Sequence, residues 1–264
     1  MIILKSNREI EIMREAGAIL YKVMNNLKKM VKEGVSANQI NSLAEEMIVS
    51  YGATPAFKGY RGYPYSICVS VNEEVIHGFP VKEKIFKNGD IVSLDLGLMY
   101  KGYYSDMAYT IPVGEVDEEK KRLLEVGERV LYSAISMAKI GMRIGNISST
   151  IENLSKRYGY SVVKEFIGHG IGRKLHEEPE VPNFGSENSG AVLKEGMTIA
   201  IEPMICMGRG EVFVDKDGWT VKTKDNKPAV HFEHTVAITK NGPLILTSPE
   251  EIRWKTKNIL KLKV

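Results

Sequence analysis

Two aspartates within one short segment are the first residues whose spacing could do chemistry. In IVSLDLGLMYKGYYSD, Asp95 and Asp106 lie on either side of an expected hairpin turn. A turn centred on Tyr100-Lys101 would oppose them directly, with Cβ atoms about 4.5–5.5 Å apart, whereas a three-residue loop at Gly102 would leave the pair diagonal. Like charges this close are unfavourable, so we expect a cation between them. Two solvated carboxylates on an exposed strand are the alternative.

Two further acidic residues occur inside apolar, strand-like segments. Glu202 lies in IAIEPM, and Glu233 lies in VHFEHTVAIT, where we expect one strand from Val230 to Thr239. A single glutamate in such a strand usually faces solvent. Four clustered carboxylates would instead raise one another's pKa unless their charge were balanced. Two divalent cations match the four negative charges.

His169 is the candidate nitrogen ligand of such a centre. It lies in FIGHGIG, where glycines at 168, 170 and 172 let backbone and ligand approach closely. One imidazole with four carboxylates is a hard, oxygen-rich donor set, which favours Mn, Fe(II) or Co and is also compatible with Zn. Two metal ions about 3.5–4 Å apart can activate water for hydrolysis.

A weak internal repeat indicates which elements position these residues. At an offset of 107 residues, NGDIVSLD ending at Asp95 matches KEGMTIAIE ending at Glu202. In each half, two helical segments come before strand-like segments rich in Val, Ile and Tyr. Capping-box patterns at Ser6-x-x-Glu9 and Ser36-x-x-Gln39 open the first two helices. The expected helices run from about 6 to 33, 36 to 51, 117 to 139 and 146 to 158.

This order predicts an α+β fold, in which helices cover one face of a mainly antiparallel sheet. We expect a single catalytic domain over residues 1–264. Its halves, roughly 6–110 and 117–240, are expected to face each other across a pseudo-twofold axis. The site would then lie between the two lobes.

Composition excludes several classes of protein. With 43% hydrophobic and 26% charged residues, the 264-residue chain is typical of a globular protein rather than a disordered or fibrous one. The net charge of +3 is too small to indicate a DNA-binding surface. No apolar run reaches the roughly 18 residues of a membrane span, and no secretory segment is evident. Cys68 and Cys206 form no CxxC pair. We expect a cytoplasmic protein without membrane or DNA partners.

Taken together, the motifs resemble those of a type I methionine aminopeptidase of the short bacterial or organellar kind. GYPYSICVSVNEEVIHGFP, DLGLMYKGYYSD, GHGIGRKLHEEP, IEPM and DGWTVKTKD…HFEHT occur in the expected order along essentially the whole chain. The resemblance implies the pita-bread fold shared with prolidases and creatinases. It also implies metal-dependent removal of the initiator methionine from nascent proteins and peptides whose second residue is small.

The resemblance further implies roles for the five candidate ligands. Asp106 and Glu233 would bridge two metal ions, Asp95 would complete the second site, and His169 with Glu202 would complete the first. Water activated at the metals would attack the scissile carbonyl, with Glu202 as the proton shuttle and the metals stabilising the tetrahedral intermediate.

Substrate contacts follow from the same resemblance. His77 would contact the substrate backbone beyond the scissile bond, and His176 would hydrogen-bond the carbonyl oxygen as charge develops. Leu175 stands where the family often has a bulkier aromatic, which affects pocket size. The methionine pocket would be lined by Tyr60, Tyr63, Cys68 and Trp219, with Phe57 nearby.

Three other protein classes are alternatives to a type I methionine aminopeptidase. A proline-specific peptidase would use the same ligands, but such enzymes usually carry a further N-terminal domain. A type II methionine aminopeptidase needs an inserted subdomain, and only 32 residues separate His169 from Glu202. A non-catalytic binding protein would be expected to have lost metal ligands.

We expect a monomer, whose basic segment KTKNILKLKV at 255–264 could contact ribosomal RNA.

Overall fold

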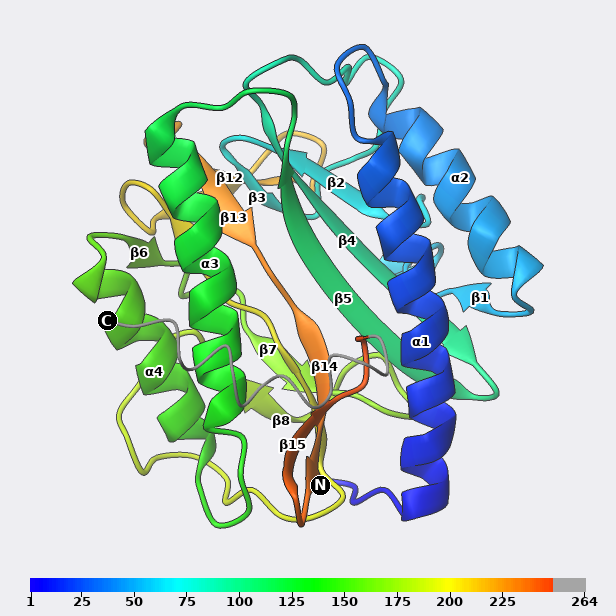
Figure 1. The fold of residues 1–264 in the computed structure, drawn as a ribbon, viewed down its shortest axis with the longest axis vertical. Helices are drawn as coiled ribbons and strands as arrows, with labels where there is room; N and C mark the ends of the chain where they lie inside the picture. Colours follow the sequence, from blue (N-terminus) through cyan, green and yellow to red (C-terminus); the bar gives the residue numbers. More distant parts are fainter. Residues whose placement is uncertain (249–264) are drawn as a thin grey trace.

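A computed structural model describes residues 1–248 of the chain. The basic segment at 255–264 lies outside the described residues. Figure 1 shows two pairs of helices, α1 (Asn7–Met30) with α2 (Ala37–Ser50), and α3 (Glu118–Ser136) with α4 (Ile144–Arg157). Long strands run between the two pairs. Within the described part of the chain, no helix is long and apolar enough to cross a membrane.

The helices begin where their capping residues predict. Ser6 caps α1, because its hydroxyl accepts the Glu9 N–H while the Glu9 carboxylate accepts the Ser6 N–H. Ser36 and Gln39 form the same box at α2. The four expected helices are therefore confirmed, with ends displaced by three residues or fewer. Each half has two helices followed by strands, as expected.

All described strand pairs are antiparallel, which confirms the expected sheet type. The strands form four small sheets: β1–β4–β2 with β5 beside β4, β13–β10–β6, β11–β12–β3, and β15–β14–β9–β7–β8. Their bounds are β1 Thr54–Pro55, β2 Cys68–Val71, β3 Glu74–Ile76, β4 Ile91–Tyr100, β5 Tyr103–Pro112, β6 Ser161–Val162, β7 Gly168–Gly170, β8 Glu177–Val181, β9 Thr198–Ile201, β10 Met204–Cys206, β11 Val212–Val214, β12 Val221–Thr223, β13 Ala229–His231, β14 His234–Thr239 and β15 Gly242–Ile245.

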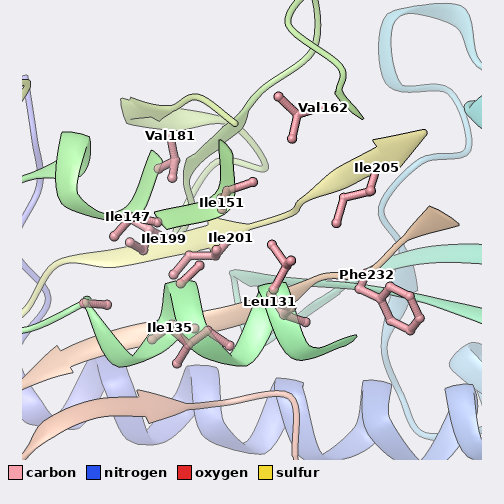
Figure 2. Packing of buried hydrophobic residues seen from close by; sticks show 14 of the residues in the cluster. Leu131, Ile135, Ile147, Ile151, Val162, Val181, Ile199, Ile201, Ile205 and Phe232 are labelled. Atoms are coloured by element: carbon pink, nitrogen blue, oxygen red, sulfur yellow. The ribbon is translucent and has the colours of Figure 1, made fainter. Parts of the chain in front are cut away.

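Two hydrophobic clusters hold the helix pairs on the strands. In one of them, shown in Figure 2, Leu131 and Ile135 of α3 and Ile151 of α4 pack with Ile199 and Ile201 of β9. The other joins the apolar faces of α1 and α2 to β4 and β5. Full burial of one such side chain stabilises the fold by about 1.5–3 kcal/mol. The strands that carry the candidate ligands are thus backed by rigid cores.

In the β4–β5 hairpin, Asp95 and Asp106 do not lie directly opposite each other, as a turn at Tyr100-Lys101 would have placed them. The turn is Lys101-Gly102, a two-residue loop with positive φ at both residues, and not a turn at Tyr100-Lys101 or a three-residue loop. Asp95 therefore pairs with Ala108, and Asp106 pairs with Gly97. The two carboxylates are diagonal neighbours on one face, offset by two residues, because type I′ turns match the natural twist of the strands.

The single strand predicted from Val230 to Thr239 is also wrong. The chain forms β13 and β14, with Phe232 and Glu233 in a break between them. Glu202 lies in a matching break between β9 and β10, rather than inside one strand. Since β9 pairs with β14 and β10 pairs with β13, both glutamates lie where neighbouring strands pass from one sheet to another.

Candidate metal and substrate site

Three predicted ligands from distant segments meet at the middle of the molecule. Ligand atoms of Asp106 on β5, His169 on β7 and Glu233 lie within 4.8 Å of one another, and all three residues are buried. Figure 1 shows β5, β7 and β14 converging in this region. The Glu233 N–H donates to the Ala108 carbonyl over 2.9 Å, which joins the first-half hairpin directly to the second half.

The glycines beside His169 permit this approach. A Cβ at Gly168 would lie 2.5 Å from the Ala200 carbonyl oxygen, and one at Gly170 would lie 2.1 Å from that of Glu178. Any larger residue would push the backbone of β7 away from its neighbours. The expected close approach around His169 is therefore confirmed for the backbone.

His169 is oriented with one ring nitrogen toward the carboxylates. Its Nδ1 lies 2.9 Å from the Gly170 carbonyl oxygen, to which an Nδ1–H donates, and Nε2 lies 3.6 Å from Glu202 Oε1. Burial and the neighbouring His176 lower the pKa of His169 to about 3. The ring is thus neutral with Nε2 available, which is the state that binds a metal ion.

The four carboxylates are costly to ionise without a counter-charge. Burial raises the pKa of Asp106 to about 7. Burial and the adjacent Asp106 raise the pKa of Asp95, Glu202 and Glu233 well above the usual values, with further contributions among the carboxylates themselves. Glu233 Oε1 is buried without a hydrogen-bond partner in residues 1–248. An oxygen-rich, buried, unbalanced donor set of this kind fits divalent metal ions.

Two further histidines face the same cavity. His77 has a positive φ of 58°, and its ring packs edge-on against Trp219 and Phe166. The His176 ring is tilted by 55° against that of His169, with 4.2 Å between ring centroids, and its Nδ1 lies 2.7 Å from the Tyr60 hydroxyl. The pKa of each is lowered to about 4, first by burial and then by a neighbouring basic side chain, which is His176 for His77 and the Arg61 guanidinium for His176. Both rings are therefore neutral near pH 7.

All the predicted site residues line one cavity of about 310 Å³. Its apolar part is aromatic: the Tyr63 ring lies 5.1 Å from that of Trp219. Leu175 is buried at the wall, next to His176. Sequence analysis missed several lining residues, whose types carry no chemical signal outside the fold. These are Arg61, Ile76, Glu165, Phe166 and Ile167.

Sequence analysis also assigned no role to His231. Its Nε2 lies 3.5 Å from Glu202 Oε2, and the side chain is almost fully buried. Burial and the nearby His77 lower its pKa to about 3. Its place two residues before Glu233 is the signal that could have suggested a role.

The chain is similar to known metallopeptidases in both sequence and structure. The model of metallopeptidase family M24 matches residues 11–240. The chain is 49% identical to a methionine aminopeptidase of Clostridium perfringens and 48% identical to methionine aminopeptidase 1 of Bacillus subtilis, each over 94% of this chain and 99% of the relative. The crystal structure of methionine aminopeptidase from Thermotoga maritima superimposes with a TM-score of 0.93 at 47% identity, covering 94% of this chain and 100% of that one. A prolidase from Pyrococcus furiosus gives 0.76 at 29% identity, covering 94% of this chain and 66% of the prolidase.

Proposed function

Because the chain belongs to metallopeptidase family M24, and within it to the methionine aminopeptidases, we propose that its central carboxylate and histidine cluster holds two divalent metal ions beside a methionine pocket. The fold is the pita-bread fold of that family. The enzyme is a metal-dependent hydrolase that removes N-terminal methionine. The main support for the proposed metal centre is that ligand atoms of Asp106, His169 and Glu233 lie within 4.8 Å of one another.

Each ligand is given a distinct place in this centre. Asp106 and Glu233 would be shared by the two ions, Asp95 would complete the set of one ion, and His169 with Glu202 would complete the set of the other. The diagonal position of Asp95 and Asp106 on one hairpin face supports a shared centre. The donor set favours Mn, Fe(II) or Co. When bound, the metals supply Lewis acidity and lower the pKa of water.

The chain's own groups move the protons and orient the substrate. Glu202 accepts the proton of the attacking water and passes it to the leaving amine, a role that suits a carboxyl group whose pKa is raised by burial. The Tyr60 hydroxyl donates to His176 Nδ1 and so keeps the proton on Nε2. Nε2–H then donates to the scissile carbonyl oxygen as negative charge develops.

The aromatic part of the cavity provides the substrate pocket. Tyr63, Trp219 and Cys68 offer an apolar surface suited to a thioether, which has only weak polar handles. Phe57 and Tyr60 close the same cavity, while His77 contacts the substrate backbone beyond the scissile bond. We further propose that only a small second residue is accepted, and that the enzyme acts as a cytoplasmic monomer on nascent chains.

Release of methionine from Met-Ala-Ser tests this function. The assay compares Met-Phe-Ser and Ala-Pro-Ser, using metal-stripped protein with and without Mn or Co. Metal-dependent cleavage of Met-Ala-Ser alone is expected. Equal cleavage of Met-Phe-Ser would refute the small-residue rule, and cleavage of Ala-Pro-Ser alone would indicate proline specificity. Lack of cleavage with every metal would favour a binding protein.

A further inference from the structure

The backbone of His231 is held in one place by hydrogen bonds on both sides. It is the last residue of β13, opposite Met204 of β10. Its N–H donates to Thr110 Oγ1 over 2.9 Å, and its carbonyl oxygen accepts from the same hydroxyl over 2.9 Å. Thr110 belongs to β5, the strand of Asp106. His231 is therefore fixed relative to the proposed metal ligands from both halves of the chain.

The imidazole ring of His231 lies beside a carboxylate oxygen of Glu202. Its Nε2 lies 3.5 Å from Glu202 Oε2, while Nδ1 and Nε2 both lack hydrogen-bond partners in residues 1–248. His231 is 1% exposed, and Glu202 lines the cavity whereas His231 does not. A buried N–H is almost always bonded in folded proteins. A hydrogen bond between Nε2 and Oε2 would have a donor–acceptor distance of about 2.9 Å, shorter than the 3.5 Å between them here.

Glu202 is placed between two imidazoles, with one oxygen toward each. Oε1 lies 3.6 Å from His169 Nε2, and Oε2 lies 3.5 Å from His231 Nε2. His169 has its Nδ1 bonded to Gly170, so its Nε2 carries no proton to give to Glu202. His231 has no such bond on Nδ1 and is free to keep its proton on Nε2. Beside the Glu202 carboxylate, His169 therefore presents a ring nitrogen without a proton, whereas His231 is able to present an N–H donor.

We propose that His231 is a positioning residue, whose Nε2–H donates to Glu202 Oε2 and keeps Oε1 turned toward His169 and the metal centre. This inference rests on the proposed role of Glu202 as ligand and proton shuttle. A partner that orients a ligating carboxylate changes metal affinity or activity by roughly 10- to 100-fold. Because His231 does not line the cavity, its loss should leave peptide binding intact.

A matched pair of variants isolates the hydrogen-bond donor. His231→Gln keeps an N–H donor on a chain of similar length, and His231→Met keeps the length without the donor. We expect His231→Met to raise the dissociation constant for Mn(II) about 10- to 100-fold and to lower kcat, with KM for Met-Ala-Ser unchanged. His231→Gln should stay close to the wild-type enzyme in both. Calorimetric titration of metal-stripped full-length protein measures the affinity.

His234→Gln is the control for loss of a buried histidine near the site. Its ring bonds to Thr247 Oγ1 at 2.9 Å and lies 3.4 Å from the Tyr132 hydroxyl. It should leave Mn(II) affinity unchanged. Wild-type affinity in His231→Met, or equal losses in the Gln and Met variants, would overturn the donor role of His231. A wild-type protein that neither binds Mn(II) nor releases methionine would instead refute the proposed function.

Nitrogen-15 NMR of the wild-type imidazoles tests the same inference without a substitution. The chain has five histidines, so their ring signals can be separated. We expect His231 to carry its proton on Nε2 both before and after addition of diamagnetic Zn(II). A proton on Nδ1, or a shift of Nε2 to a metal-coordinated value, would overturn the proposal and make His231 a ligand instead.

Discussion

Burial of acidic side chains without an internal counter-charge is the main electrostatic property of the site. Burial raises the folded-state pKa of Asp106 to about 7, from an ordinary value of 3.8. Between these values the folded metal-free protein holds a proton that the unfolded chain has lost. The contribution of Asp106 to the free energy of unfolding is therefore fully present below about pH 4 and is lost as the pH rises through 7.

We expect metal-stripped protein to unfold at a lower temperature at pH 8 than at pH 5. Each unit of raised pKa corresponds to about 1.4 kcal/mol, so the effect should be large. Asp106→Asn should reduce this pH dependence while abolishing peptide cleavage. Calorimetric scans at both pH values measure the change. A midpoint that rises from pH 5 to pH 8 would show that these carboxyl groups ionise freely in the fold.

Tyr60 makes a polar contact that its predicted place in the methionine pocket did not include. Its hydroxyl lies 2.7 Å from His176 Nδ1. Tyr60→Phe should lower kcat about 10- to 100-fold, because His176 then loses its preferred tautomer, while KM for Met-Ala-Ser changes little. Steady-state kinetics separate the two constants, and His176→Asn provides the reference for complete loss. An altered KM with unchanged kcat would assign Tyr60 to methionine binding alone.

At the scale of elements, the sequence predicted where helices begin better than it predicted how strands pair. Ser6 and Ser36 mark helix starts because capping depends on neighbouring residues only. The hairpin register depends on positive φ at Lys101, which the residue type does not reveal. The breaks at Glu202 and Glu233 arise from pairing between distant strands, so local hydrophobicity predicted continuous strands there.

The strand β8 is tied to the N-terminal segment by a buried ion pair. Lys5 Nζ lies 2.6 Å from Glu177 Oε2, and both side chains are almost fully buried. Glu177 directly follows His176, so the pair also restrains the segment that carries this histidine. Lys5→Met would leave a buried carboxylate without its partner.

We expect Lys5→Met to destabilise the fold by about 3–5 kcal/mol, measured by urea unfolding. The double variant Lys5→Met, Glu177→Leu should recover much of this loss, because no unpaired charge stays buried. Lys58→Met is the matched control, since its pair with Glu45 is exposed and worth about 0–1 kcal/mol. Equal effects of the two single variants would contradict a special role for the buried pair.

At the scale of the molecule, all the candidate site residues predicted from the sequence line one cavity, although they span Phe57 to Glu233. Residue types and motif order were sufficient for this. His231 was missed because its contact with Glu202 exists only when β10 and β13 pair. We propose that the two halves, roughly 6–110 and 117–240, are related by the internal repeat and form one domain.

Metal binding should stabilise the whole domain, because the proposed ligands from both halves meet only in the folded state. Mn(II) at 100 times its dissociation constant should stabilise the stripped protein by about 2.7 kcal/mol. Glu233→Gln should remove most of this gain, since it takes away a proposed bridging ligand. Thermal scans across a Mn(II) titration measure the shift. A wild-type midpoint independent of Mn(II) would rule out binding to the folded state.

The chain connection between Pro112 at the end of β5 and Glu118 at the start of α3 offers one practical use. A cut there would leave Asp95 and Asp106 on one fragment and His169, Glu202 and Glu233 on the other. Neither fragment alone would hold the full ligand set, so methionine release would require the two to reassemble. The enzyme could therefore serve as a split reporter, in which fused partner proteins bring the fragments together and catalysis registers their association.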